Sequence, residues 1–220
     1  MKSKQASATT RAKNSSTNDR QFDPQDLERV RRGFIAARTE PTITDDKGRK
    51  VIDTASYEFL RDGRECPETV NPHLWRHATL NAHHGLFEVA PNVWQVRGYD
   101  ISNITFIRGA TGWVVIDPLT ADSTARASLE LLSQHVERLP VSAVIYTHSH
   151  ADHFGGVLGV TTKADVESGK CQIIAPVGFL HEAIAENVIA GVAMSRRATY
   201  QFGPLLPPGP QGHVDSGLGI

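Results

Sequence analysis

Residues 141–153 read VSAVIYTHSHADH, an apolar run followed by three histidines and an aspartate. The first six residues predict a strand buried in a sheet that is covered on both faces. The polar part then forms a loop at the carboxyl end of that strand, where α/β folds place their sites. Because residues i and i+2 of an extended segment face the same way, His148 and His150 can converge on one cation. We expect Asp152 and His153, from the following turn, to point into a neighbouring space.

These residue types indicate a metal site. Imidazole nitrogens and carboxylate oxygens are zinc ligands, and two ions about 3.5–4 Å apart form a common hydrolytic centre. The alternative is a merely exposed polar loop or a tag-like histidine cluster, but a tag is terminal and has no buried strand before it. The sequence therefore predicts metal ligands at His148, His150, Asp152 and His153.

Four residues do not fill the coordination shells of two zinc ions, so at least two or three further ligands are required. The candidates downstream are histidines and acidic residues, of which those on the expected helix are better explained as ordinary solvated positions. They are His181, Glu182, Glu186, His213 and Asp215.

Composition narrows the function classes. The chain has 220 residues and a formal net charge of -1, which removes the electrostatic argument for a nucleic-acid or anionic-membrane partner. Its apolar runs are all shorter than the roughly 18 residues needed to span a membrane. Cys66 and Cys171 are too few for a disulfide framework, and whether they pair stays open.

The beginning of the chain differs from the rest. Residues 1–20 are polar and basic, which predicts a disordered tail, and no apolar stretch of a signal peptide follows them. Arg31 and Arg32 resemble a twin-arginine export signal, but the apolar stretch after them is too short. We therefore expect a cytoplasmic protein. Residues 21–85 are expected to form a helical N-terminal extension.

From residue 86 onward the pattern changes to short β-branched segments with turns, and then to alternating strands and helices. This order is typical of an α/β protein with a helix-covered sheet. Strands are predicted at Leu86–Ala90, Val93–Arg97, Ile101–Arg108, Trp113–Asp117, Val141–Tyr146 and Cys171–Ala175, and helices at 120–138 and 177–190.

The histidine run after a buried strand resembles the metallo-β-lactamase superfamily, and further segments resemble the linear alkyl sulfatases (type III sulfatases) within it. These segments are NPHLWR at 71–76, HGLFEV at 84–89, WQVRG at 94–98, SNIT at 102–105, GWVVIDPLT at 112–120, IYTHSH at 145–150 and MSRRATY at 194–200.

The resemblance implies a zinc-dependent enzyme that hydrolyses linear alkyl sulfate esters such as dodecyl sulfate to an alcohol and inorganic sulfate. It implies two zinc ions, with His148 and His150 on the first and Asp152 and His153 on the second. Asp152 is implied also to orient the zinc-bound water that attacks. Tyr200 either lines the substrate channel or is a buried structural residue. Complete members of the family are expected to be homodimers.

The resemblance also implies an αββα sandwich, of which residues 86–220 supply only the first half. We therefore expect an N-terminal portion of a longer enzyme, with an exposed sheet face and an unpaired edge. Whether the chain is active alone stays open. One alternative is another hydrolase of the superfamily, acting on a lactam, thioester or lactone. The other is an inactive truncated product.

Overall fold

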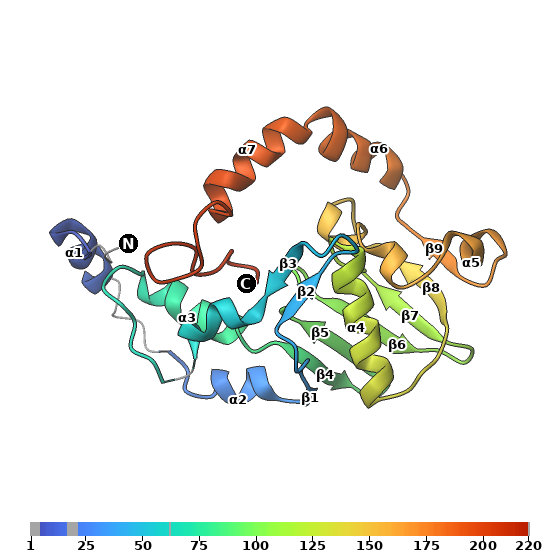
Figure 1. The fold of residues 1–220 in the computed structure, drawn as a ribbon, viewed down its shortest axis with the longest axis horizontal. Coiled ribbons are helices and arrows are strands. Elements are labelled where there is room, and N and C mark those ends of the chain that lie inside the picture. Colours follow the sequence, from blue (N-terminus) through green and yellow to red (C-terminus); the bar gives the residue numbers. More distant parts are fainter. Residues whose placement is uncertain (1–4, 17–21, 62, 220) are drawn as a thin grey trace.

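The computed structural model describes residues 5–16, 22–61 and 63–219, and a seven-stranded sheet lies at its centre (Figure 1). The strand order is β1-β4-β5-β6-β7-β8-β9. In this sheet β1 and β4 to β7 pair antiparallel, whereas β8 and β9 join in parallel. The bounds are β1 Phe34–Ala36, β4 Gly85–Ala90, β5 Val93–Arg97, β6 Ile104–Arg108, β7 Trp113–Ile116, β8 Val141–Ile145 and β9 Gln172–Ile174.

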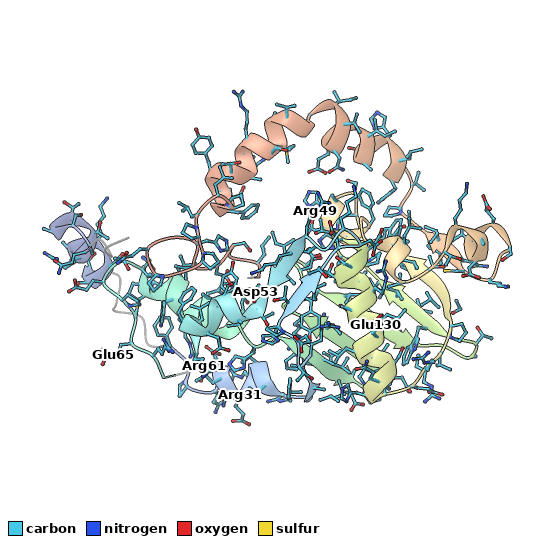
Figure 2. The ribbon with its side chains drawn as sticks, in the orientation of Figure 1. Arg31, Arg49, Asp53, Arg61, Glu65 and Glu130 are labelled. Atoms are coloured by element: carbon cyan, nitrogen blue, oxygen red, sulfur yellow. The ribbon has the colours of Figure 1, made fainter. Side chains whose placement is uncertain are left out.

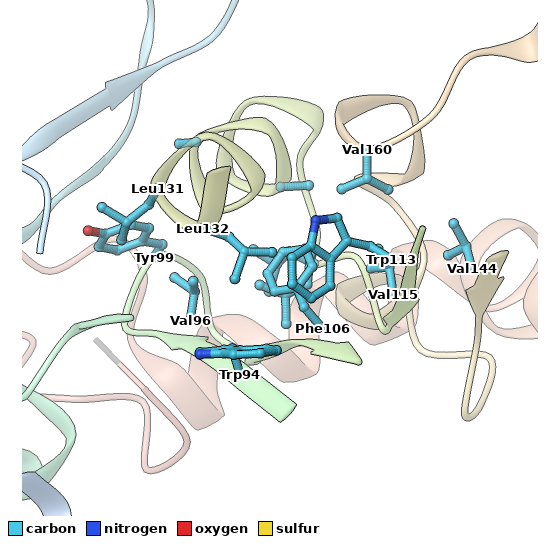
Figure 3. Packing of buried hydrophobic residues seen from close by; sticks show 14 of the residues in the cluster. Trp94, Val96, Tyr99, Phe106, Trp113, Val115, Leu131, Leu132, Val144 and Val160 are labelled. Atoms are coloured by element: carbon cyan, nitrogen blue, oxygen red, sulfur yellow. The ribbon is translucent and has the colours of Figure 1, made fainter. Parts of the chain in front are cut away.

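Helix α4, Asp122–His135, connects β7 to β8 and packs its apolar side on the sheet. Figure 3 shows Leu132 of this helix pointing towards large side chains of the strands. Trp94 and Trp113 meet edge to face, with their ring centroids 5.4 Å apart, and Trp113 is fully buried. This edge-to-face packing adds to the stabilisation from burial alone.

A two-stranded hairpin, β2 Thr42–Thr44 and β3 Lys50–Asp53, lies beside α4 (Figure 1). Ile43 of β2 belongs to the same core as the sheet. Glu130 lies on the exposed side of α4 (Figure 2), and its Oε2 is 3.9 Å from Nη1 of Arg38. The hairpin and α4 therefore cover the same face of the seven-stranded sheet.

The segment before Gly85 contains strands as well as helices, which differs from the helical extension expected. Helix α2 covers Asp26–Arg31, the 3₁₀ helix η1 covers Thr54–Leu60, and α3 covers Pro72–Asn81. Gly33 has φ +74° and its ideal Cβ would lie 1.9 Å from a carbonyl oxygen of β4. Glycine therefore ends α2 here and lets β1 pair with β4, through contacts that helical periodicity does not reveal.

The predicted disordered tail falls partly outside the described residues. Within it, the structure has helix α1 at Ala8–Ser16, which differs from the expectation. The Ser7 hydroxyl accepts a hydrogen bond from the Thr10 amide at the start of this helix, and Asn14 donates to the carbonyl oxygen of Glu68. Helix α1 is thus held by a local cap and one contact to residue 68, and it has no buried residue.

The chain after the histidine loop forms short elements and then an arc. The 3₁₀ turns η2 and η3 cover Ala151–His153 and Val157–Gly159, and helix α5 covers Lys163–Glu167. Beyond β9, helix α6 covers Phe179–Ile184, a π-helical turn η4 covers Ala185–Ile189, and α7 covers Gly191–Phe202. Residues 203–219 then return to α3 (Figure 1), where Val214 packs with Trp75 in a second core.

Strand β9 is an edge of the sheet, with Ile173 and Ile174 37% and 46% exposed. The arc also carries exposed apolar side chains, Leu180 and Val188 among them. These features agree with the exposed edge that the sequence predicts. In the described part of the chain, no helix has both the length and the apolar character needed to cross a bilayer. Cys66 and Cys171 are both free thiols.

Candidate metal centre

The histidine loop leaves the carboxyl end of β8, as the sequence predicts. At this end of β8 the Tyr146 amide still donates to the Ile174 carbonyl of β9. The chain then runs through Thr147 and turns into η2, where the His153 amide donates to the His150 carbonyl. Ser102, in the loop before β6, donates its hydroxyl hydrogen to the carbonyl oxygen of Asp152. Strand β8 and the loop before β6 therefore fix the turn that carries the polar side chains.

Asp117, at the end of the neighbouring strand β7, lies beneath this loop. Its backbone has φ 54°, a left-handed conformation that Asp tolerates better than most residues, and its side chain is buried. One carboxylate oxygen accepts from the Thr147 amide at 2.8 Å. The other lies 2.7 Å from the Thr147 hydroxyl and 2.9 Å from Nδ1 of His153. Asp117 thus holds both the start and the end of the loop.

The three histidine rings lie against one another. The ring centroid of His148 is 4.6 Å from that of His150 and 4.1 Å from that of His153. Nε2 of His148 lies 3.1 Å from Nδ1 of His150. On the other side, Nε2 of His153 lies 3.1 Å from a carboxylate oxygen of Asp152. Two pairs of possible donor atoms therefore lie close together, one from His148 and His150 and one from Asp152 and His153.

Electrostatics favour a neutral imidazole at His148. Desolvation by burial lowers the pKa of this ring, and the positive forms of His153 and His150 lower it further, against the opposing effect of Asp117 and Asp152. A neutral imidazole keeps the lone pair that a cation requires. Its location therefore suits a ligand.

The donor set fits a divalent cation. Two ligands that each lie 2.0–2.1 Å from a tetrahedral zinc ion are separated by about 3.3 Å, close to the 3.1 Å between the nitrogens of His148 and His150. One atom each from Asp117, His148 and His153 also lies within 4.8 Å of the other two. Imidazole and carboxylate donors in such proximity are suited to zinc and related metals.

The structure brings His148, His150, Asp152 and His153 together, and their assignment as ligands stays a prediction. Of the further candidates, only Glu186 is recorded in contact with this group, 3.3 Å from Nε2 of His150. The remaining candidates have other neighbours or are exposed. His181 is 84% exposed and contacts Glu182, His213 contacts Tyr57, and Asp215 accepts from Asn81.

Tyr200 lies on α7 and is 92% exposed, so it is not a buried structural tyrosine in this structure. Sequence reasoning missed Asp117 as a site residue. Its signal was present, since an acidic residue closes an otherwise apolar strand, WVVID at 113–117.

This chain is similar to several known proteins of one superfamily. Residues 97–218 match the model of the metallo-beta-lactamase superfamily. The chain is 48% identical over 197 residues to a linear primary-alkylsulfatase from Pseudomonas sp., covering 90% of this chain and 29% of the relative. It is 52% identical over 198 residues to the alkyl/aryl-sulfatase BDS1 of Saccharomyces cerevisiae, and the match covers 90% of this chain and 30% of that relative.

Among solved structures, the stereoselective inverting sec-alkylsulfatase Pisa1 from Pseudomonas sp. superposes with a TM-score of 0.91 at 47% identity. The superposition covers 98% of this chain and 34% of that one. These matches confirm the expected fold class, part of an α/β domain of the metallo-β-lactamase type. The chain spans about a third of the length of the relatives it matches.

Proposed function

Because this chain belongs to the metallo-β-lactamase superfamily, we propose that it carries part of a metal-dependent site that hydrolyses alkyl sulfate esters. The observation that carries the proposal is the convergence of His148, His150, Asp152 and His153 at the end of β8. The relatives that share about half of its residues are named alkylsulfatases, which supports a sulfate ester as substrate. They include enzymes named for primary and for secondary alkyl sulfates. A linear alkyl sulfate such as dodecyl sulfate is the substrate we propose.

The chain's own residues would divide the work by position. His148 and His150 present two nitrogens to one side of the site, and Asp152 and His153 present an oxygen and a nitrogen to the other. We infer zinc, with two ions, from this arrangement and from the donor types. A divalent ion bound there supplies Lewis-acid chemistry to ester hydrolysis.

The proton-handling group in this proposal is Asp152. Its carboxylate is about one quarter exposed, so a water molecule can reach one of its oxygens. The contact with Nε2 of His153 fixes the direction of the carboxylate. The hydrogen bond from Ser102 to the Asp152 carbonyl holds the backbone of this residue in place. We infer that Asp152 accepts a hydrogen bond from the attacking water and orients its lone pair towards the ester.

The proposal extends to organisation. Residues 86–220 would form the catalytic part and residues 21–85 an extension packed on it, through β1 and the α3 core. A homodimer and a cytoplasmic location stay predictions, which gel filtration and fractionation of cells would test.

The test combines metal content with sulfate release. We expect this chain to bind zinc, and a protein of the relatives' full length that contains these residues to hydrolyse dodecyl sulfate. His148→Ala should weaken zinc binding in this chain and abolish turnover in the longer protein. His181→Ala is the matched control, because its imidazole is exposed and lies outside the cluster. Metal binding that is unchanged in His148→Ala would refute the site. Metal binding by the longer protein with no release of sulfate from any alkyl sulfate would refute the substrate.

A further inference from the structure

The π-helical turn η4 reaches the histidine loop from the arc. Glu186 Oε1 lies 3.3 Å from Nε2 of His150. The side-chain amide of Asn187 donates from Nδ2 to the backbone carbonyl oxygen of Ser149 at 3.4 Å. It also donates to the backbone carbonyl oxygen of Ala183, one turn back, at 2.9 Å. π-helical turns are rare and are frequently found at functional sites. This one directs two consecutive side chains at the segment that carries His148 and His150.

Glu186 is distinguished from its neighbours by burial. Its side chain is 24% exposed, whereas Val188 and Ile189 of the same turn are 73% and 81% exposed. Glu182, one turn earlier, is 67% exposed and contacts only the exposed His181 among the recorded ion pairs. The π turn therefore places one carboxylate against the loop and leaves the nearest other carboxylate outside.

The two nitrogens of His150 face different partners. Nδ1 lies 3.1 Å from Nε2 of His148, and Nε2 lies against Glu186. The other two rings show the same division. Nδ1 of His148 lies 2.9 Å from the Thr147 hydroxyl, and Nδ1 of His153 lies 2.9 Å from an Asp117 oxygen. Each ring thus has one nitrogen held from outside and one turned towards the cluster.

We propose that Glu186 is a positioning residue of the metal centre, which accepts the hydrogen of Nε2 of His150 and thereby leaves Nδ1 as the ligand atom. This rests on the metal site in the proposed function. Histidines that bind metals nearly always donate their second ring hydrogen to a carboxylate, a carbonyl or water, which fixes the tautomer and the ring orientation. His150 has the greatest need of such a partner, because its side chain is 57% exposed and that of His153 only 21%.

A direct ligand role for Glu186 is the competing arrangement. It would require the ion to lie at Nε2 of His150, on the side that faces away from His148. The short distance between Nδ1 of His150 and Nε2 of His148 favours the other side. The two arrangements differ in what a neutral acceptor at position 186 can replace, since a glutamine amide oxygen accepts a hydrogen bond but is a poor ligand for a divalent ion.

Affinity for Co²⁺, measured by competition with a chromogenic chelator, tests the inference. We expect Glu186→Ala to weaken binding about ten- to hundredfold without changing the number of ions bound. Glu186→Gln should recover part of this loss, because its amide oxygen accepts from Nε2. Glu182→Ala is the matched control and should bind as the unaltered protein does. In a His150→Ala background, Glu186→Ala should have no further effect.

The outcomes separate the two proposals. If the unaltered protein binds no Co²⁺, the metal site and this inference are both overturned. If it binds Co²⁺ and Glu186→Ala binds equally well, only the inference is overturned. A loss in Glu186→Gln as large as in Glu186→Ala, with a changed Co²⁺ absorption spectrum, would overturn it in favour of a direct ligand. The thermal unfolding midpoint of each variant checks that the fold is retained.

Discussion

Replacing Asp117 by Asn changes the hydrogen bonds under the histidine loop and little else. The side chain keeps its size, and Asn tolerates the left-handed backbone at this position, φ 54°. The carboxylate has two oxygens and three hydrogen-bond donors, the Thr147 amide, the Thr147 hydroxyl and Nδ1 of His153. An amide has only one oxygen, so in either orientation its NH₂ group faces at least one of these donors.

The magnitude follows from the less costly orientation. With the amide oxygen towards His153, the bond to its Nδ1 becomes neutral and loses about half of its 1.5–3 kcal/mol. The Thr147 amide loses its acceptor, which costs about 1 kcal/mol or more. We therefore expect the free energy of unfolding to fall by about 2 kcal/mol. The same amount in metal binding corresponds to about a thirtyfold weaker affinity, within the range for loss of an outer hydrogen-bond partner.

Urea unfolding and Zn²⁺ competition titrations measure these two effects. Asp46→Asn is the control, since Asp46 is 81% exposed and pairs only with Arg126 among the recorded ion pairs. Zinc affinity of Asp117→Asn within twofold of the unaltered protein would refute the reasoning that the charged hydrogen bond from His153 to Asp117 strengthens metal binding. A fall in stability without a fall in affinity would leave Asp117 as a structural residue only.

Three further predictions concern the core, a glycine and a buried carboxyl. Trp113→Ala should lower the free energy of unfolding by about 3–5 kcal/mol in urea, because the indole is fully buried. Gly156→Ala should lower it by about 1–3 kcal/mol, since a Cβ would lie 2.3 and 2.6 Å from two backbone carbonyl oxygens; Gly191→Ala, where nothing lies within 4 Å, should not. Burial raises the pKa of Asp215 above 3.8, so its stability contribution is lost as pH rises from 3.8 through the raised value. Urea unfolding at several pH values should show the free energy of unfolding of Asp215→Asn rising relative to that of the unaltered protein over this interval. A difference that stays constant with pH would contradict this.

Local patterns predicted much of the fold. Asn71 caps α3 and Pro72 opens it, so Pro72–Asn81 was predictable from signals within four residues. Strands Lys50–Asp53 and Val93–Arg97 follow from β-branched residues between turns. Strand β1 was not predictable in this way, because it depends on pairing with β4, some fifty residues later in the chain. Its three residues continue an apolar periodicity that also suits a helix.

The candidate site divides along the same line. His148, His150, Asp152 and His153 lie within six residues, so one strand and one turn determine their grouping. Asp117 and Glu186 reach them from thirty or more residues away. A single acidic residue at a strand end or on a helix has no spacing that marks it. Sheet order and a π-helical turn decide these two contacts, and neither is encoded in a local pattern.

The change from antiparallel to parallel pairing at β7 has a kinetic consequence. Strands β4 to β7 pair with their neighbours in sequence across short turns, whereas β8 and β9 join only after the chain has passed through α4 and α5. Contacts between distant residues form more slowly, so we expect β8 to dock on an existing meander. The histidine loop would then be assembled late in folding and be among the first parts to open. Ion release would precede loss of the sheet, and amide hydrogen exchange in β8 would slow when the ion is bound.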